Sequence, residues 1–208
     1  ILLRQDNADK RLTPIGYKYG LIDDKRMGKM NEKYQRQENL IQFIKSAKIE
    51  PKKINSFLVE AGTSTLSQKT TLQNILLRPQ ISIWNLIEHD SSLNEYAKNQ
   101  NINNEELENV EIAIKYANAV KSKYDFVKII LFGSYAKGNF HADSDIDIAV
   151  ILKDYNNLID IQLDLMRLRR KIDSRIEPHP FREKDFDITN PFVNEIIKYG
   201  QDIKINVA

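Results

Sequence analysis

Two aspartates separated by a single residue, Asp145 and Asp147, stand out in the stretch 128–152, KIILFGSYAKGNFHADSDIDIAVIL. Acidic and apolar residues alternate from Asp145 to Ile148, so a strand here places both carboxylates on one face and Ile146 and Ile148 on the other. Adjacent carboxylates repel each other, and a divalent cation that prefers oxygen ligands, such as Mg²⁺, removes that repulsion. The pattern therefore predicts a magnesium site on a strand.

A glycine and a serine, Gly133 and Ser134, precede these aspartates at the end of the apolar run 129–132. The run has the length of a buried strand, and the residues up to Lys137 are able to begin a helix. A Gly-Ser turn between strand and helix presents backbone N–H groups and a hydroxyl to a phosphate. Lys137 is a weaker candidate for the same contact. Together the two patterns predict a site for a metal-bound nucleoside triphosphate.

The spacing Gly133-Ser134, ten residues, Asp145-x-Asp147 resembles the signature of the DNA polymerase beta-like nucleotidyltransferase superfamily, and above all its small branch, the minimal nucleotidyltransferases. The apolar flanks supply the strand context that such a motif needs. The resemblance implies transfer of a nucleoside monophosphate to a hydroxyl acceptor, with ATP as the default donor, two Mg²⁺ ions and a third carboxylate on a neighbouring strand. The alternative is a plain turn followed by a solvated strand end.

Glu177 is the choice for that third carboxylate, as metal ligand and catalytic base, because a strand after the helix predicted over 156–172 places it beside the two aspartates. Asp173, at the end of that helix, is the rival. Pro178 and Pro180 indicate a sheet edge. His179 has three interpretations, as a loop residue, a substrate contact or a base, and the first is favoured.

The first half of the chain carries a second resemblance, to the C-terminal helical region of the glucose-inhibited division protein A family, flavin-dependent enzymes that modify the wobble uridine of tRNA. The residues that carry it are LLRQDNAD at 2–9, RLT at 11–13 with Gly16, LLRP at 76–79 and VEIAIKY at 110–116. The resemblance implies contacts with tRNA and with a partner GTPase. The chain lacks a Gly-x-Gly-x-x-Gly dinucleotide loop, so FAD is not expected and the wobble chemistry does not carry over.

These patterns predict an α+β protein with an all-helical accessory domain over 1–104 and a nucleotidyltransferase domain over 105–208, in which helices flank a mixed sheet. Helices are expected from Asp23 to about Ala47, from Pro51, and from a cap at Asn104. No sheet is expected before residue 104. A last helix beginning at Asn190-Pro191 and a final strand over 203–207 complete the expected domain.

The composition and the charge distribution limit the kinds of metal site and binding partner that the chain is expected to have. The 208 residues contain no cysteine, which excludes a thiolate metal site. No apolar run approaches the roughly 18 residues of a membrane span, and no secretory leader is recognisable; a cytoplasmic protein without a membrane partner is expected. Residues 1–104 hold 16 Lys+Arg against 11 Asp+Glu, and residues 105–208 hold 15 against 18. The basic half permits tRNA binding, with the candidates Lys29, Lys33, Arg36, Lys45, Lys48, Lys52 and Lys53.

The leading hypothesis is an adenylyltransferase that modifies a protein. The resemblance to minimal nucleotidyltransferases implies a HEPN-type toxin as partner and an antitoxin role by transfer of AMP (AMPylation) to a toxin tyrosine. tRNA and a small antibiotic are the alternative acceptors. A second hypothesis is a non-catalytic module that docks tRNA or a GTPase, and a third is a fusion whose halves share no task.

Overall fold

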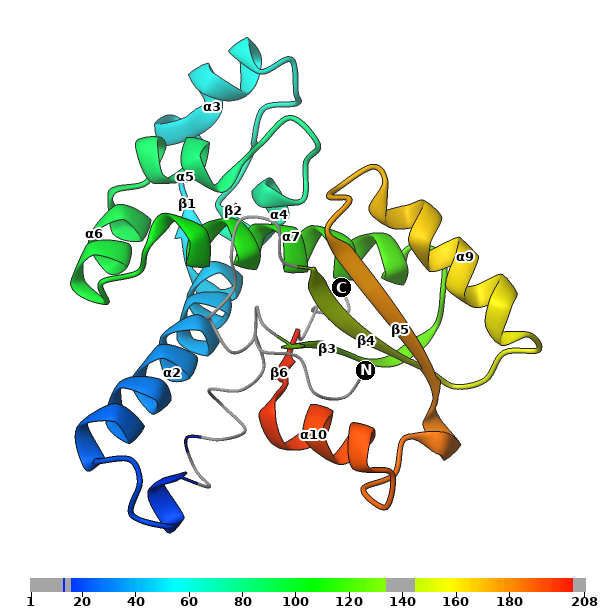
Figure 1. The fold of residues 1–208 in the computed structure, drawn as a ribbon. Coiled ribbons are helices and arrows are strands. Elements are labelled where there is room, and N and C mark those ends of the chain that lie inside the picture. Colours follow the sequence, from blue (N-terminus) through cyan, green and yellow to red (C-terminus); the bar gives the residue numbers. More distant parts are fainter. Residues whose placement is uncertain (1–12, 14–15, 134–144, 204–208) are drawn as a thin grey trace. The chain divides into compact units, whose positions relative to one another are not determined.

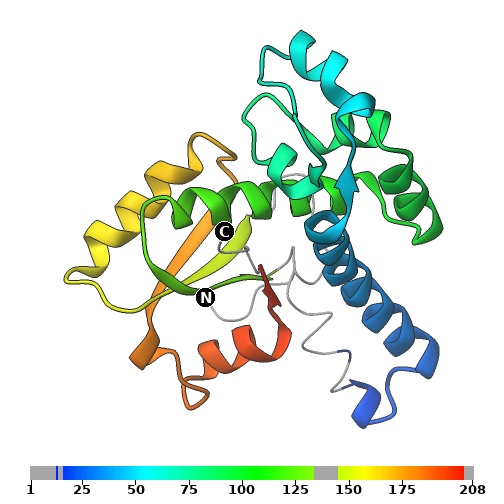
Figure 2. The same cartoon turned by 180° about the vertical axis from the view of Figure 1, so that it is seen from behind.

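The computed structural model of the chain describes residues 13, 16–133 and 145–203. They form two compact units: one is residues 36–115, and the other combines the described residues up to 35 with those from 116 onward. The division falls inside two long helices, α2 (Asp24–Ser46) and α7 (Asn104–Lys121). Figures 1 and 2 show the elements of each unit from opposite sides.

Residues 36–115 are mainly helical, as predicted. Besides parts of α2 and α7, the unit contains α3 (Pro51–Glu60), α4 (Leu72–Leu76), α5 (Ile83–His89) and α6 (Ser91–Asn99). The expectation of no sheet in this half was wrong, because β1 (Lys48–Ile49) and β2 (Thr70–Thr71) pair antiparallel. Strands of two residues are too short to show a period in the sequence.

Side-chain caps define where several helices of this unit begin. The Ser82 side chain caps α5 in a reciprocal capping box with Asn85, which takes the position that Glu or Gln usually has in such a box. At α7 the cap is Asn103 rather than the expected Asn104. The Asn103 side chain accepts a hydrogen bond from the backbone N–H of Glu106 at 2.8 Å, and the Glu106 carboxylate accepts one from the backbone N–H of Asn103 at 2.9 Å.

An apolar core lies within residues 36–115, and a partly buried ion pair connects α7 to it. Lys115 Nζ lies 2.6 Å from Glu111 Oε1 and donates to the carbonyl of Ile81 at 2.7 Å, while Glu111 Oε2 accepts from the backbone N–H of Ile83 at 2.8 Å. These bonds fix the turn that leads into α5. The buried side chains of the core include Leu40, Ile44, Ile49, Ile54, Leu58, Leu72, Ile75, Ile83, Leu93, Val110 and Ile114.

The other unit contains a four-stranded sheet in the order β5-β4-β3-β6. Its strands are β3 (Phe126–Phe132), β4 (Ile146–Leu152), β5 (Ile176–Arg182) and β6 (Gln201–Asp202). β3 is antiparallel to β4 and β6, whereas β4 and β5 are parallel. The mixed sheet is thus confirmed. The final strand lies at 201–202 instead of the expected 203–207, of which only residue 203 is described.

Helices lie on both sides of this sheet. α9 (Leu158–Arg169) connects the parallel strands β4 and β5, as such a pair requires, and α10 (Pro191–Tyr199) follows a 3-10 turn, η2 (Glu183–Asp185). Figure 1 shows α9 above the sheet and α10 below it. β5 is an edge strand, which tolerates prolines because their missing N–H groups break no ladder there. The edge inferred from Pro178 and Pro180 is therefore confirmed.

Among the residues that the structure describes, no helix combines the length and the hydropathy needed to span a bilayer.

Candidate active site on the β4–β5 strand pair

Two carboxylates stand side by side on one face of the sheet, because Asp147 of β4 pairs in register with Glu177 of β5. Ile146 and Ile148, on either side of Asp147, are both fully buried and project from the opposite face. The alternation read from the sequence is therefore present in β4. Asp147 itself is only 9% exposed, and a buried carboxylate needs a compensating partner.

Gly133 closes over the Asp147 carboxylate at the end of β3. Its φ of +72° lies in the left-handed region, where residues other than glycine are strained. A Cβ at this position would lie 1.8 Å from Asp147 Oδ2 and 2.6 Å from its Cγ. Both the backbone conformation and the neighbouring carboxylate therefore require glycine at position 133.

His179 completes the group on this face. The favoured interpretation as a loop residue was wrong: His179 lies within β5, two residues after Glu177 and so on the same face. Its Nε2 lies 3.2 Å from Asp147 Oδ1, a hydrogen bond that an ionised carboxylate accepts from the ring N–H. The two-residue interval from Glu177 is the sequence signal that could have identified it.

Asp147, Glu177 and His179 each offer one ligand atom, and these three atoms all lie within 4.8 Å of one another. Two carboxylate oxygens and one imidazole nitrogen at such separations fit a divalent cation. Asp145 lies immediately before β4 and is partly buried. Within the described part of the chain, Asp145 is not a member of this three-residue group.

The other predicted site residues fall elsewhere. Ser134 and Lys137 lie outside the described residues. Asp173, the rival third carboxylate, lies in the turn before β5 and forms an ion pair with Arg175 at 2.7 Å. Burial raises the pKa of Asp173, but hydrogen bonds from the Arg175 side chain and backbone outweigh it and hold the pKa below its usual value. The structure thus brings Glu177, and not Asp173, next to Asp147.

Aromatic rings pack beside the group formed by Asp147, Glu177 and His179. The His179 ring makes an edge contact with Phe132 of β3 at 5.1 Å between centroids and another with Phe192 of α10 at 6.0 Å. Phe181, two residues further along β5, contacts Phe192 as well. These rings pack on buried Ile130 and other apolar side chains of the same face. The polar group therefore lies at one end of an apolar layer between the sheet and α10.

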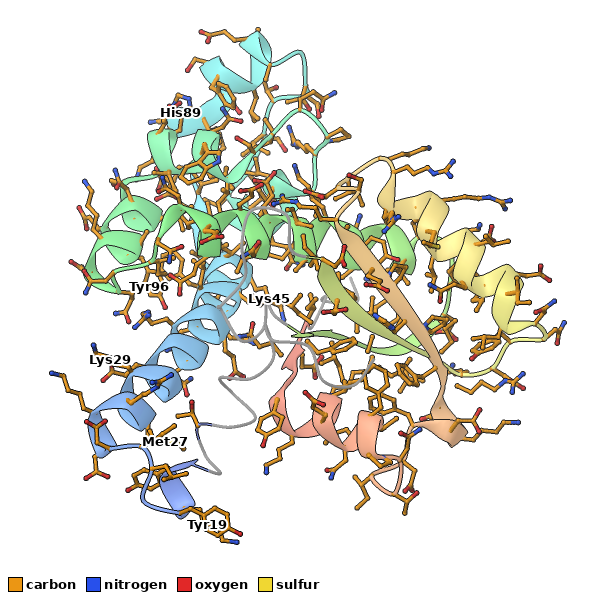
Figure 3. The ribbon with its side chains drawn as sticks, in the orientation of Figure 1. Tyr19, Met27, Lys29, Lys45, His89 and Tyr96 are labelled. Carbon is orange, nitrogen blue, oxygen red and sulfur yellow. The ribbon has the colours of Figure 1, made fainter. Side chains whose placement is uncertain are left out.

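The basic candidates for tRNA contact are not equally accessible. Lys45, labelled on α2 in Figure 3, is only 8% exposed, which removes it from any binding surface. Arg36 lies 3.8 Å from the buried carboxylate of Glu106. Lys48, Lys52 and Lys53 are exposed, as is Lys29 on α2. Only part of the basic set is thus available to a nucleic acid.

Comparison with known families gives two matches. Residues 24–123 match the family described as the tRNA modifying enzyme MnmG/GidA C-terminal helical domain, and residues 113–203 match the nucleotidyltransferase domain. The two matches overlap over residues 113–123, most of which belong to α7. The helix before the signature strand thus lies within both matches.

Individual relatives carry the name of the first of these two families. The tRNA uridine 5-carboxymethylaminomethyl modification enzyme MnmG of Flavobacterium psychrophilum is 37% identical over 119 residues, 57% of this chain and 19% of that enzyme. Its counterpart in Cytophaga hutchinsonii is 38% identical over 120 residues, 58% of this chain and 19% of the enzyme. That in Caldicellulosiruptor saccharolyticus is 39% identical over 124 residues, 59% of this chain and 19% of the enzyme.

The chain spans about a fifth of the length of these curated relatives, 19% of each. The nucleotidyltransferase match covers the sheet that carries Asp147 and Glu177. Both resemblances drawn from the sequence are confirmed: residues 24–123 are similar to the C-terminal helical domain of the MnmG/GidA enzymes, and residues 113–203 are similar to nucleotidyltransferase domains.

Proposed function

We propose that the chain is a divalent-metal-dependent nucleotidyltransferase of the minimal type, which transfers AMP from ATP to a hydroxyl group. The observation that carries the proposal is the pairing of Asp147 with Glu177 on adjacent strands, within a region that matches nucleotidyltransferase domains. Asp147 is buried and Glu177 is partly buried, and a cation between two such neighbouring carboxylates would offset their mutual repulsion. In the proposed enzyme, this pair of carboxylates binds the divalent cation that the reaction needs.

Asp147 and Glu177 would hold a divalent cation, and Asp145 would contribute from the position just before β4. Bound divalent cations neutralise phosphate charge and lower the pKa of an acceptor hydroxyl. Gly133, Ser134 and Lys137 bind the phosphates of the donor through backbone N–H groups, a hydroxyl and an ammonium group. The chain's main contribution is then to orient donor and acceptor.

In the proposed transfer, one bond to the α-phosphorus forms and one breaks. Glu177 accepts the proton of the acceptor hydroxyl, whose oxygen forms a bond to the α-phosphorus of ATP. The bond from the α-phosphorus to the oxygen that bridges to the β-phosphate breaks, and pyrophosphate leaves with the electron pair. The products are pyrophosphate and an acceptor that carries AMP in a phosphodiester linkage. The reaction uses no reactant other than ATP and the acceptor.

For the acceptor we propose a tyrosine hydroxyl on a protein such as a HEPN-type toxin, which gives the chain the role of an antitoxin. This part rests on the likeness to small nucleotidyltransferases, an analogy at the level of the family. The region matched by that family ends at residue 203 and begins at 113. Such a short domain leaves little room for a separate pocket that binds small acceptors. This favours a macromolecular acceptor, such as a protein, that binds through its own surface.

The acceptor test supplies α-labelled ATP, GTP, CTP or UTP with MgCl₂ to the protein, together with whole-cell protein or bulk tRNA. The proposal expects label from ATP on a protein band, and Asp147→Asn abolishes it. Label on tRNA alone would replace the proposed acceptor while keeping the reaction. If no acceptor is labelled and calorimetry detects no metal-dependent nucleotide binding, the proposed enzyme is wrong.

A second candidate function is a non-catalytic docking module for tRNA or a GTPase. The observation in its favour is the identity of 37% over 119 residues with a protein named as a tRNA modification enzyme. Exposed Lys48, Lys52 and Lys53 supply a small basic surface for RNA. Binding of bulk tRNA that is lost on triple substitution of these lysines, in a protein without transferase activity, would favour this candidate.

A further inference from the structure

His179 differs in kind from the carboxylates beside it, because it supplies a nitrogen ligand to a group whose other members supply oxygen. Its position follows from the register. It pairs with Ala149 of β4, two register positions along the strands from the Asp147–Glu177 pair and on the same face of the sheet. The His179 ring reaches Asp147, and its side chain is 27% exposed.

The separation of the ligand atoms matches a coordination shell. His179 Nε2 and Asp147 Oδ1 lie 3.2 Å apart. Two ligands bound at right angles, each about 2.1 Å from a metal, lie about 3 Å apart. One ligand atom from each of Asp147, Glu177 and His179 lies within 4.8 Å of the other two. A cation between the three residues therefore needs only small side-chain movements and would replace the direct contact between His179 and Asp147.

The His179 ring is also held in the orientation that such binding needs. Edge contacts with Phe132 and Phe192 restrict its rotation from two sides. A ligand whose ring is fixed before the metal arrives loses little conformational freedom on binding.

We propose that His179 is a direct ligand, with Asp147 and Glu177, of the cation at this site, and that the site therefore prefers Mn²⁺ or a later transition metal to Mg²⁺. Imidazole nitrogen suits transition metals, whereas Mg²⁺ favours oxygen ligands and keeps much of its water. The inference rests on the proposed function only in assigning the bound metal a role in nucleotidyl transfer. The metal site itself stands on the geometry of the three residues.

The test loads the full chain with one equivalent of Mn²⁺ and measures electron spin echo modulation, which reports ¹⁴N nuclei bound to the metal. The wild type is expected to show nitrogen coupling, and His179→Gln to lose it. His89→Gln is the matched control, because His89 stacks on Phe57 in the helical unit and should leave the signal unchanged. Calorimetry should show the preference for Mn²⁺ over Mg²⁺ reduced by about 10-fold or more in His179→Gln.

Absence of nitrogen coupling in the wild type, or coupling that survives His179→Gln, would overturn the inference. An unchanged Mn²⁺ to Mg²⁺ affinity ratio in that variant would also contradict it. Failure of the proposed function looks different. Nucleotide transfer with Mg²⁺ but no nitrogen signal keeps the function and removes His179 as a ligand, whereas nitrogen coupling without any transfer keeps the ligand and removes the function.

Discussion

The Asp147 carboxylate lies where a side chain on residue 133 would have to be, because a Cβ added to Gly133 would be 1.8 Å from Asp147 Oδ2. The contact links the end of β3 to the middle of the proposed site, since Phe132, just before the glycine, pairs in register with Asp147. The glycine and the aspartate of the sequence signature are therefore one structural unit.

The variant Gly133→Ala should lose both stability and activity. The left-handed backbone costs alanine about 1–2 kcal/mol, and the methyl group must also displace the Asp147 carboxylate. Gly62→Ala is the matched control, because Gly62 has a φ of +66° but no atom within 4 Å of the added Cβ. Urea unfolding should show a larger loss for Gly133→Ala than for the control, and only Gly133→Ala should abolish transfer. Equal losses, with transfer retained, would show that Asp147 tolerates the methyl group.

The Glu111–Lys115 pair should stabilise the helical unit more than an exposed pair does. Lys115→Met removes the donor to the Ile81 carbonyl, and leaving such a buried acceptor without a partner costs about 1–3 kcal/mol. Lys69→Met is the comparison, since Lys69 and Glu50 are 60% and 46% exposed and lie 2.7 Å apart; pairs of this kind contribute about 0–1 kcal/mol. Denaturant unfolding of both variants measures the difference. Equal effects would argue against the role assigned to Lys115.

Asp164 should make stability depend on pH in the acid range. Lys123 Nζ and Tyr124 Oη each donate to Asp164 Oδ2 at 2.7 Å, and these bonds hold the pKa of Asp164 well below its usual value. A carboxyl group with a lowered folded-state pKa stabilises the fold above its unfolded pKa of about 3.9, and this contribution disappears as pH falls. The difference in unfolding free energy between wild type and Asp164→Asn should therefore be largest above about pH 4 and narrow below it. A difference that stays constant from pH 6 to pH 2.5 would be inconsistent with the lowered pKa.

Local patterns predicted those parts of the site that depend on one strand at a time. The alternation from Asp145 to Ile148 indicated which face each side chain of β4 takes, and the prolines around His179 indicated an edge strand. The interpretation of His179 as a loop residue nevertheless overlooked its two-residue interval from Glu177, which places both side chains on one face of β5.

Other features depend on residues far apart in the sequence and leave no local signal. The approach of Gly133 to Asp147 requires the register between β3 and β4, which no single stretch encodes. The pairing of β1 with β2 joins residues about twenty positions apart through strands of two residues each. At α7, adjacent asparagines offer two equivalent caps, and only the reciprocal bond to Glu106 decides for Asn103.

Transfer of label from α-labelled ATP in the presence of Mg²⁺ or Mn²⁺, compared among the wild type, Asp147→Asn and Asp160→Asn, tests the central claim most directly. Asp160 is an exposed residue of α9 and controls for the loss of one carboxylate. The proposed site predicts transfer in the wild type and in Asp160→Asn, with a reduction of about 100-fold or more in Asp147→Asn, since loss of even a residue that only supports a metal ligand costs about 10–100-fold. Transfer that is equally fast in all three proteins would contradict a catalytic site at Asp147.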